Sequence, residues 1–356
     1  MKDSGQATRK AKEKPVRLKD VAEYLGLSTT TVSLVLNNSP VAQTLSHETR
    51  KRVLKAAADL NYKANYFARA LNQKRNYLIG VLVPDFGEGY NARFITAIES
   101  ELIEKNYVYF VSSHHWDTKL IHQRLDGFVE RGVEGMILIN TPTTSFPDVP
   151  VALIGNQEIE QPCTRISLDN ADGIRQGMEH LYSLGHRQIA HLRGHKGSSD
   201  ADPRWQAYLE MCKTLDLRVD KKAVVQLERI HDGLDPIAEG YQAAQRLLSS
   251  GAKFTAMLAF NDMSAVGAIR KFKDEGLRIP QEISVVGFDN VQASQMVEPA
   301  LTTIGQPIEA MAKIATQQVL ANIEKNSRGA QHIVVKPELV IRHSSGPCLQ
   351  RAIAAS

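Results

Sequence analysis

The hydrophobic pattern of the chain changes near residue 77. From there on, short and mostly apolar runs alternate with segments in which apolar residues recur at helical spacing. Nearly continuous apolar strands that alternate with helices are typical of parallel sheets covered by helices on both faces. We therefore expect an α/β fold in this part. The predicted strands are 78–85, 107–113, 135–140, 149–155, 165–170, 188–194, 223–228, 256–262 and 283–290.

Helical segments separate most of these strands. They are predicted at 92–105, 118–131, 171–184, 203–214, 236–249 and 263–275. A chain of 356 residues exceeds a single comfortable core, and about nine strands divide most naturally into two doubly wound lobes. The pattern therefore predicts a two-lobed domain over residues 77–345 and a tail over 346–356.

The segment from Arg17 to Asn38 predicts two short helices joined by a tight turn. Asp20 lies where the dipole of a helix N-terminus favours an acid, and Gly26 is suited to end the first helix in the left-handed conformation. Ser28 is a strong N-cap for a second helix from Thr29 to about Asn37. This is the helix-turn-helix plan, in which the second helix enters the major groove of DNA.

The second of these helices has one apolar face and one mostly polar face. Val32, Val35 and Leu36 would face the first helix, whereas the opposite face lacks core residues. A helical hairpin packed into a larger core is the alternative, and it would need apolar residues on both faces. The candidate DNA-contacting residues here are Ser28, Thr29, Thr30, Thr31, Ser33, Leu34 and Asn37.

A third helix is predicted to begin near Ser46 and to close a small three-helix core. Its expected core residues are Val53, Leu54, Ala57 and Leu60. Its basic side, which suits the phosphate backbone better than base edges, comprises Arg50, Lys51, Arg52 and Lys55.

Positive charge is concentrated at the amino-terminal end of the chain. Residues 1–75 contain 15 Lys and Arg against 6 Asp and Glu, and the remainder contains 28 against 33. A basic head on an acidic body indicates a polyanion partner for the head alone. Residues 1–15 are basic and poor in hydrophobic residues, so we expect a disordered arm there.

The run DVAEYLGLSTTTVSLVLN, residues 20–37, resembles the DNA-binding signature of the lactose-repressor (LacI/GalR) family. The resemblance continues through 46–50 and 60–62 to Leu71 and extends more loosely to about His343. It implies a transcriptional regulator, a repressor that binds a double-stranded, pseudo-palindromic operator as a homodimer.

The same resemblance implies a body like that of a periplasmic sugar-binding protein. Such a body has two lobes joined by three crossovers, with a small sugar-like effector in the cleft between them. On this basis, helix 307–324 belongs to the first lobe and the strands near 332–342 belong to the second.

Residues 65–71 resemble the hinge segment of the family. The resemblance implies a short helix that orders on DNA, with Leu71 wedged into the minor groove and with Asn65 and Arg69 as polar contacts. By composition alone the segment is an ordinary linker, and Ala64 stands where the family commonly has Pro. The expected domains are therefore a helix-turn-helix domain over 1–63 and a hinge or linker over 64–76.

The sequence carries no motif that predicts catalysis. It has no P-loop, no GxGxxG after a first strand, no HExxH and no GxSxG. His114 and His115 are adjacent at a strand end and would point to opposite faces, which disfavours a metal site. We expect no enzyme activity, no cofactor and no metal. An α/β enzyme or a solute-binding protein with the same lobes is the rival hypothesis.

The cysteines and the absence of apolar targeting segments indicate the cellular compartment. The three cysteines, Cys163, Cys212 and Cys348, are far apart and suggest neither a disulfide framework nor a zinc site. The first 16 residues lack the apolar core of a signal peptide, and no apolar run approaches the ~20 residues of a membrane span. We therefore expect a cytoplasmic protein. The short tail after residue 343 predicts dimers without a tetramer-forming helix.

Ligands of open α/β sheets bind outside the carboxyl ends of the strands. The polar residues at these ends are Asp85, Tyr90, Ser112, His114, Asn156, Asp169, Arg204, Asn261, Asp262 and Asp289. Carboxylates, amides and an arginine beside aromatic residues suit a polyhydroxylated ligand. Ordinary solvation of strand ends explains each residue equally well.

The family resemblance narrows this set. It implies effector contacts from Arg204, Asn261, Asp289 and Gln306. Asp235 falls where several members have an aromatic residue, which leaves Trp205 as a candidate for stacking. The residues expected to bind the effector are Tyr90, Ser112, Asn156, Asp169, Arg204, Asn261, Asp289 and Gln306.

Overall fold

The computed structural model describes residues 16–37, 39–62, 75–87, 89–228 and 235–349. The chain forms two compact units, Met1–Asn76 and Tyr77–Ser356. We call residues 16–62 the headpiece and residues 77–349 the body. The predicted basic arm and nearly all of the predicted hinge, including Asn65, Arg69 and Leu71, lie outside the described residues.

The headpiece contains three α-helices and one 3-10 helix. They are α1 (Leu18–Leu25), α2 (Thr29–Leu36), η1 (Pro40–Thr44) and α3 (His47–Asp59). The predicted helix ends are confirmed by their caps. Gly26 ends α1 at a φ of 65°, and Ser28 Oγ accepts a hydrogen bond from the Thr31 N–H at 3.1 Å. Ser46 caps α3 in the same way. The buried core is Val21, Ala22, Val32, Val35, Ala42, Val53 and Ala56.

Leu54 was predicted to lie in this core, and that prediction is wrong. Its side chain is 56% exposed, whereas Ala56 and Ala57 are buried. Successive helical residues are rotated by roughly 100°. Val53, Ala56 and Ala57 therefore share the inner face of α3, and Leu54 is turned away from it.

The first lobe of the body is built on a parallel six-stranded sheet with the order β11-β5-β4-β3-β1-β2. Its strands are β1 (Leu78–Val83), β2 (Val108–Ser113), β3 (Gly135–Ile139), β4 (Val151–Ile154), β5 (Thr164–Leu168) and β11 (Gln331–Val335). Its helices are α5 (Tyr90–Glu104), α6 (Thr118–Glu130) and α12 (Ile308–Glu324). Every residue of β1, β3 and β4 is buried, as continuous apolar strands under helices on both faces must be.

The second lobe has the sheet order β12-β10-β9-β8-β6-β7, in which only the β10–β12 pair is antiparallel among the strands described. Its strands are β6 (Ile189–Arg193), β7 (Val224–Gln226), β8 (Ala256–Leu258), β9 (Ser284–Asp289), β10 (Thr302–Gly305) and β12 (Glu338–Val340). Its helices are α7 (Asn170–Ser183), α8 (Ala201–Thr214), η2 (Lys221–Ala223), α9 (Pro236–Ser249), α10 (Asp262–Asp274) and α11 (Ala293–Met296).

All nine predicted strands and all six predicted helices between them are present. The pattern missed β10, because its sequence is TTIG and its buried Thr302 and Thr303 are polar residues. The lobe assignment of the last strands was wrong in part. β12 pairs with β10 in the second lobe, but β11 pairs with β5 in the first.

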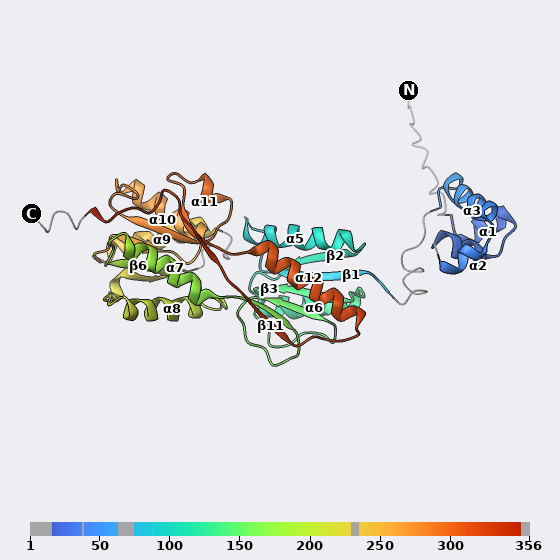
Figure 1. Cartoon of the computed structure of the whole chain (residues 1–356), viewed down its shortest axis with the longest axis horizontal. Coiled ribbons are helices and arrows are strands. Elements are labelled where there is room, and N and C mark those ends of the chain that lie inside the picture. Colours follow the sequence, from blue (N-terminus) through green and yellow to red (C-terminus); the bar gives the residue numbers. More distant parts are fainter. Residues whose placement is uncertain (1–15, 38, 63–74, 88, 229–234, 350–356) are drawn as a thin grey trace, which may run out of the picture. The chain divides into compact units, whose positions relative to one another are not determined.

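The chain passes between the lobes three times, after β5, after β10 and after β11 (Figure 1). The second passage carries α12 back to the first lobe, as predicted, where it packs on α5, β3, β4 and β5. The carboxyl ends of the parallel strands of both sheets therefore face a common cleft. Among the residues that the structure describes, no helix combines the length and apolarity needed to cross a membrane.

Candidate functional site

The outward face of α2 carries the predicted DNA-contacting residues. Thr29 and Thr30 are exposed at its first turn, and Ser33, Leu34 and Asn37 are half-buried further along. The Ser28 and Thr31 hydroxyls are 2.9 Å apart and bond to each other, so they stabilise the start of the helix. Leu34 packs in part against the headpiece core. Thr29 and Thr30 are thus the most accessible of these side chains.

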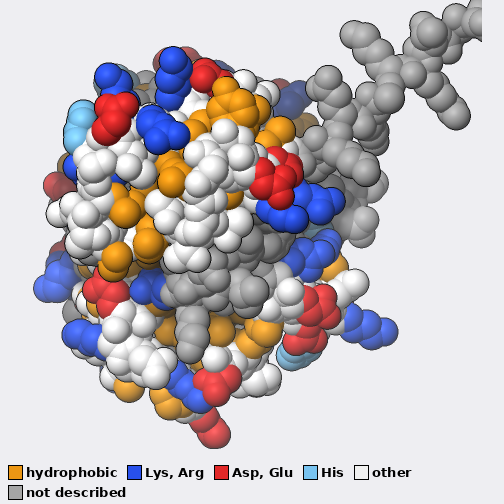
Figure 2. Space-filling view, turned by 90° about the vertical axis from the view of Figure 1, so that its right-hand side faces the viewer, with side chains coloured by type: hydrophobic (Ala, Val, Ile, Leu, Met, Phe, Trp, Pro, Cys, Tyr) orange, Lys and Arg blue, Asp and Glu red, His pale blue; other side chains and the backbone are white. Residues whose placement is uncertain are grey.

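The headpiece itself is nearly balanced in charge. Residues 16–62 contain 6 Lys and Arg against 4 Asp and Glu, whereas residues 1–15 contain 5 against 2 and residues 63–75 contain 4 against none. Over the face shown in Figure 2, positive and negative side chains are interspersed. Most of the positive charge predicted to attract a polyanion therefore belongs to the segments that flank the headpiece in sequence.

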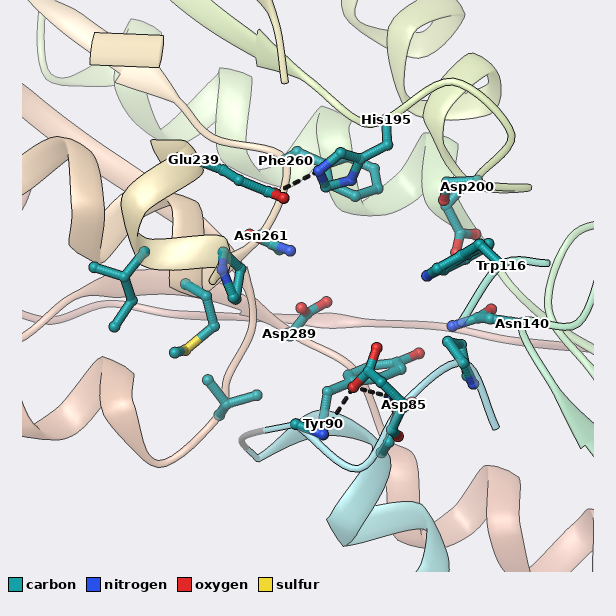
Figure 3. Close-up of a pocket in the computed structure, with 18 of the residues that line it drawn as sticks. Asp85, Tyr90, Trp116, Asn140, His195, Asp200, Glu239, Phe260, Asn261 and Asp289 are labelled. Atoms are coloured by element: carbon teal, nitrogen blue, oxygen red, sulfur yellow. Dashed lines mark hydrogen bonds and ion pairs between the residues drawn. The ribbon is translucent and has the colours of Figure 1, made fainter. Parts of the chain in front are cut away.

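A cavity of about 470 Å³ lies in the cleft of the body (Figure 3). Both lobes and the passage after β10 contribute to its wall. The principal lining residues are Asp85, Tyr90, Asn91, Trp116, Asn140, His195, Asp200, Arg204, Asp235, Glu239, Phe260, Asn261, Met263, Asp289 and Gln306. Most of these follow a strand end or begin the next helix, as expected for an open α/β sheet.

Five of the eight predicted effector residues line this cavity: Tyr90, Arg204, Asn261, Asp289 and Gln306. The other three do not. Ser112 lies on the edge strand β2, and Asp169 caps α7 by accepting a hydrogen bond from the Asp172 N–H at 2.9 Å. Asn156 lies behind the wall, where its amide donates to the Asp200 carboxylate.

Trp116, rather than Trp205, is the tryptophan of the cavity wall. The indole of Trp205 stacks with His191 and Tyr208, with ring centroids 5.9 and 5.5 Å apart. Trp116 and the preceding His115 both have positive φ, at 60° and 47°. This unusual pair of left-handed residues turns the chain after β2 toward the cleft.

Arg204 is held rigidly in the first turn of α8 and is only 3% exposed. Its Nε donates to Asn170 Oδ1 at 2.8 Å, and its Nη1 donates to the Phe260 carbonyl at 2.6 Å. The guanidinium carbon lies 3.6 Å from the centre of the Phe288 ring. These contacts fix the orientation of one cation beside the cavity.

Asp289 is buried and ends β9 in a strained conformation, with φ at 114°. Its carboxylate accepts a hydrogen bond from Gln306 Nε2 at 2.7 Å, and Gln306 Oε1 accepts one from the Tyr90 hydroxyl at 3.2 Å. Burial raises the pKa of Asp289 to about 7 despite the nearby Arg204. Burial also raises the pKa of Tyr90, which keeps its hydroxyl protonated as a donor.

The strand-end rule missed several residues of the wall. Asp200 precedes α8, and Glu239 lies in the first turn of α9, where its carboxylate pairs with His195 at 2.6 Å. Asn91 lies in the first turn of α5. No strand ends directly before these residues, so a search at the first turns of helices would have been needed to find them.

Asp289→Asn should change how stability depends on pH. In wild-type protein the carboxyl has a folded pKa of about 7 and an ordinary value of 3.8. The folded state therefore holds this proton more tightly, and the group's contribution to stability is lost as pH rises from about 4 to 7. The amide of the variant does not titrate, so the variant does not lose stability in this pH range. We expect the variant to gain stability over wild type by up to roughly 1.4 kcal/mol per pH unit in that window, measured by urea unfolding. Parallel stability profiles would contradict the assignment.

The fold and the cavity define a class of protein: a helix-turn-helix domain followed by a two-lobed body with a ligand cleft. Two family models and several known regulators match this chain. Residues 17–65 match the family described as bacterial regulatory proteins, lacI family, and residues 178–345 match the periplasmic binding protein-like domain.

The full-length relatives agree. The HTH-type transcriptional repressor PurR of Pectobacterium carotovorum is 31% identical over 93% of this chain and 98% of its own length. The HTH-type transcriptional regulator DegA of Bacillus subtilis is 28% identical over 92% and 97%. The lac repressor dimer bound to operator and the anti-inducer ONPF is 29% identical, with a TM-score of 0.82 over 94% of this chain and 100% of that one.

The chain belongs to the LacI family of bacterial regulatory proteins. It is a DNA-binding transcriptional regulator, as the resemblance of residues 20–37 predicted. The relatives named above are regulators and not enzymes.

Proposed function

We propose that this protein is a repressor that binds a pseudo-palindromic operator as a homodimer and responds to a small sugar-like effector in the cleft. The observation that carries the proposal is the cavity, whose wall combines residues of both lobes with hydrogen-bonding groups and aromatic rings. A LacI family regulator from Enterococcus faecium with bound ribose, 25% identical with a TM-score of 0.67, supports the sugar class. We also propose a cytoplasmic location.

In the proposed DNA complex, α2 enters the major groove with Thr29 and Thr30 leading. Ser33, Leu34 and Asn37 follow along the same face. Leu71 would wedge into the minor groove between the two half-sites, with Asn65 and Arg69 beside it. The positive charge flanking the headpiece would neutralise phosphates on either side.

The proposed dimer uses the outer edge of the first lobe. Within the described residues, no strand pairs with the outer side of β2. Val108, Phe110 and Val111 of this strand are exposed, as is Ile103 at the end of α5. An apolar, unpaired edge is a poor surface for a monomer. A second copy of this surface would cover it symmetrically, as suits a two-fold operator.

The effector would act by changing the relation between the lobes. Tyr90 and Asp85 reach the cavity from the first lobe, and Arg204 and Asp289 reach it from the second. A ligand that contacts both sides favours one spacing of the lobes over others, and the dimer surface of the first lobe moves with it. The coupling is reciprocal: an effector that weakens operator binding is itself bound more weakly on the operator.

Selection from random DNA with the full-length protein tests the proposal. We expect one enriched sequence with two half-sites related by two-fold symmetry. Binding to it should weaken with salt at a log–log slope steeper than about −2, because each neutralised phosphate contributes about −0.9. A protein that binds small ligands but enriches no DNA sequence would instead be a solute-binding protein.

The same selection tests the role of Leu34. Leucine can contact only apolar groups, and the thymine methyl is the apolar group of the major groove. We expect an A·T pair with its methyl toward Leu34, and replacing that thymine by uracil should weaken binding about fourfold, the value of one buried methyl. Leu34→Ala should remove the difference. A strong G·C requirement that persists in Leu34→Ala would show that Leu34 serves only the headpiece core.

A further inference from the structure

Carboxylates outnumber cations on the wall of the cavity. The acidic residues are Asp85, Asp200, Asp235, Glu239 and Asp289, and the basic residues are His195 and Arg204. Two of the acids have local partners: Glu239 pairs with His195 at 2.6 Å, and Asp235 caps α9 at the exposed rim. The wall then has three further carboxylates, those of Asp85, Asp200 and Asp289, and one further cation, Arg204.

Arg204 makes no direct ion pair with these three carboxylates, all of which are described. Its hydrogen bonds to Asn170 and to the Phe260 backbone go to neutral oxygens. Arg93, whose charge also reaches Asp289, binds both oxygens of Glu309 at 2.8 and 2.9 Å. Asp200 and Asp289 are buried, and buried carboxylates without a paired cation are costly. The raised pKa of Asp289 is a sign of this cost.

Behind the surface of the wall lies a hydrogen-bond acceptor for which the described residues supply no donor. Asn91 is 8% exposed and lines the cavity. Its amide nitrogen donates to the backbone oxygen and to Oδ1 of Asp85, at 3.1 and 3.2 Å, which fixes the orientation of the amide. Within the described residues, Asn91 Oδ1 has no partner. This oxygen is itself shielded from the cavity, so it is not a ligand contact, but its partial negative charge adds to that of the neighbouring Asp85 carboxylate.

Aromatic rings stand beside the carboxylates. Tyr90, Trp116 and Phe260 line the same cavity, and Figure 3 shows Trp116 next to Asp200 and Tyr90 next to Asp85. Ring faces attract cations, most strongly when both are removed from water. Acidic groups and aromatic faces therefore both favour a ligand rich in donors and positive in charge.

We propose that the effector is a polyhydroxylated amine, such as an amino sugar, whose protonated nitrogen is held by the carboxylates that lack a direct cation. The inference rests on the proposed role of the cavity as the effector site. A neutral sugar would leave the negative charge uncompensated. An acidic sugar would be repelled. The cavity, at about 470 Å³, has the size of a small-molecule site.

Matched sugar series test the proposal on the full-length protein. The probes are the 2-amino and 6-amino deoxy derivatives of glucose, galactose and mannose, each beside its parent sugar and its N-acetyl derivative. Binding is measured by calorimetry near pH 7. We expect at least one amine to bind at least tenfold more tightly than both of its neutral counterparts. A neutral member that binds as tightly as its amine, or a panel in which no amine binds, overturns the proposal.

Single substitutions of the carboxylates test which of them bind the protonated amine. Asp200→Asn and Asp289→Asn should each weaken binding of the amine at least tenfold more than binding of the parent sugar, since each removes one carboxylate charge but keeps a polar side chain. Asp220→Asn is the matched control, because this exposed residue caps η2 far from the cavity wall. Equal losses for amine and parent sugar would show that charge does not decide the preference.

The two proposals fail in different ways. If a neutral sugar binds and changes operator affinity while the amines do not bind, the effector role of the cavity stands and the amine inference falls. If an amine binds with the expected preference but no ligand alters operator affinity, the cavity chemistry stands and the regulatory role falls. Operator affinity is read by fluorescence anisotropy with the selected duplex.

Discussion

Val32→Asn is expected to abolish operator binding by the full-length protein, with a loss of at least a hundredfold in affinity. Val32 is fully buried in α2, inside a headpiece core whose buried residues are all Val and Ala. An amide buried there without partners costs about 1–3 kcal/mol, and the lost apolar packing adds to it. So small a domain has little stability in reserve. The helix that reads DNA would therefore lose its support.

Leu54→Asn is the matched control for this loss. It makes the same kind of change in the same headpiece, but Leu54 is 56% exposed, so we expect operator affinity within about threefold of wild type. In both variants the ligand-binding body should unfold at the wild-type temperature. Near wild-type operator binding by Val32→Asn would show that the three-helix core does not position α2.

Arg204→Met is expected to be the most destabilising of the substitutions considered, at about 3–5 kcal/mol above pH 7. Methionine keeps the apolar contact with Phe288 but removes the hydrogen bonds to Asn170 and to the Phe260 carbonyl. It also removes the cation whose charge lowers the pKa of Asp289. The loss should shrink at lower pH, where Asp289 can bind a proton and become neutral. Urea unfolding of the ligand-free protein measures it.

Two further variants separate charge from packing. Arg175→Met removes an arginine whose pairs with Asp172 and Glu179 lie at the surface of α7, so it should cost less than about 1 kcal/mol. The double variant Arg204→Met/Asp289→Asn should be more stable than the sum of its single changes predicts. The reason is that the Asp289 carboxylate, which the charge of Arg204 stabilises in wild-type protein, is removed together with Arg204. Strict additivity would mean that Arg204 stabilises the fold through packing and hydrogen bonds alone.

Local features of the sequence predicted local features of the fold. Gly26, Ser28 and Ser46 set helix ends through their own backbone and hydroxyl groups, and the apolar runs identified nine strands. Non-local choices were less predictable. β11 pairs with a strand that lies far earlier in the chain, and nothing in its five residues indicates which open sheet edge it will join.

The residues of the cavity wall show the same difference between local features, which were predicted, and non-local features, which were not. Arg204, Asn261 and Asp289 were found because strand ends converge by topology and because the family resemblance marked them. Asp200 and Glu239 were missed because they belong to helix starts, whose place on the wall depends on how α8 and α9 pack. Asn156 shows the opposite case: it is a polar strand-end residue that was expected to face the ligand, and in the structure it donates a hydrogen bond to Asp200 of the wall.

The three passages between the lobes affect how the chain folds while it is being made. The first lobe needs α12 and β11, yet these are synthesised only after nearly all of the second lobe. Until residues 308–335 leave the ribosome, the apolar faces of β3, β4 and β5 that α12 covers lie open, and β5 remains an unpaired edge. The first half of the body to be translated thus stays incomplete until most of the second half has been made. During that interval, we expect the exposed apolar surface and the unpaired edge to make the nascent chain prone to aggregation.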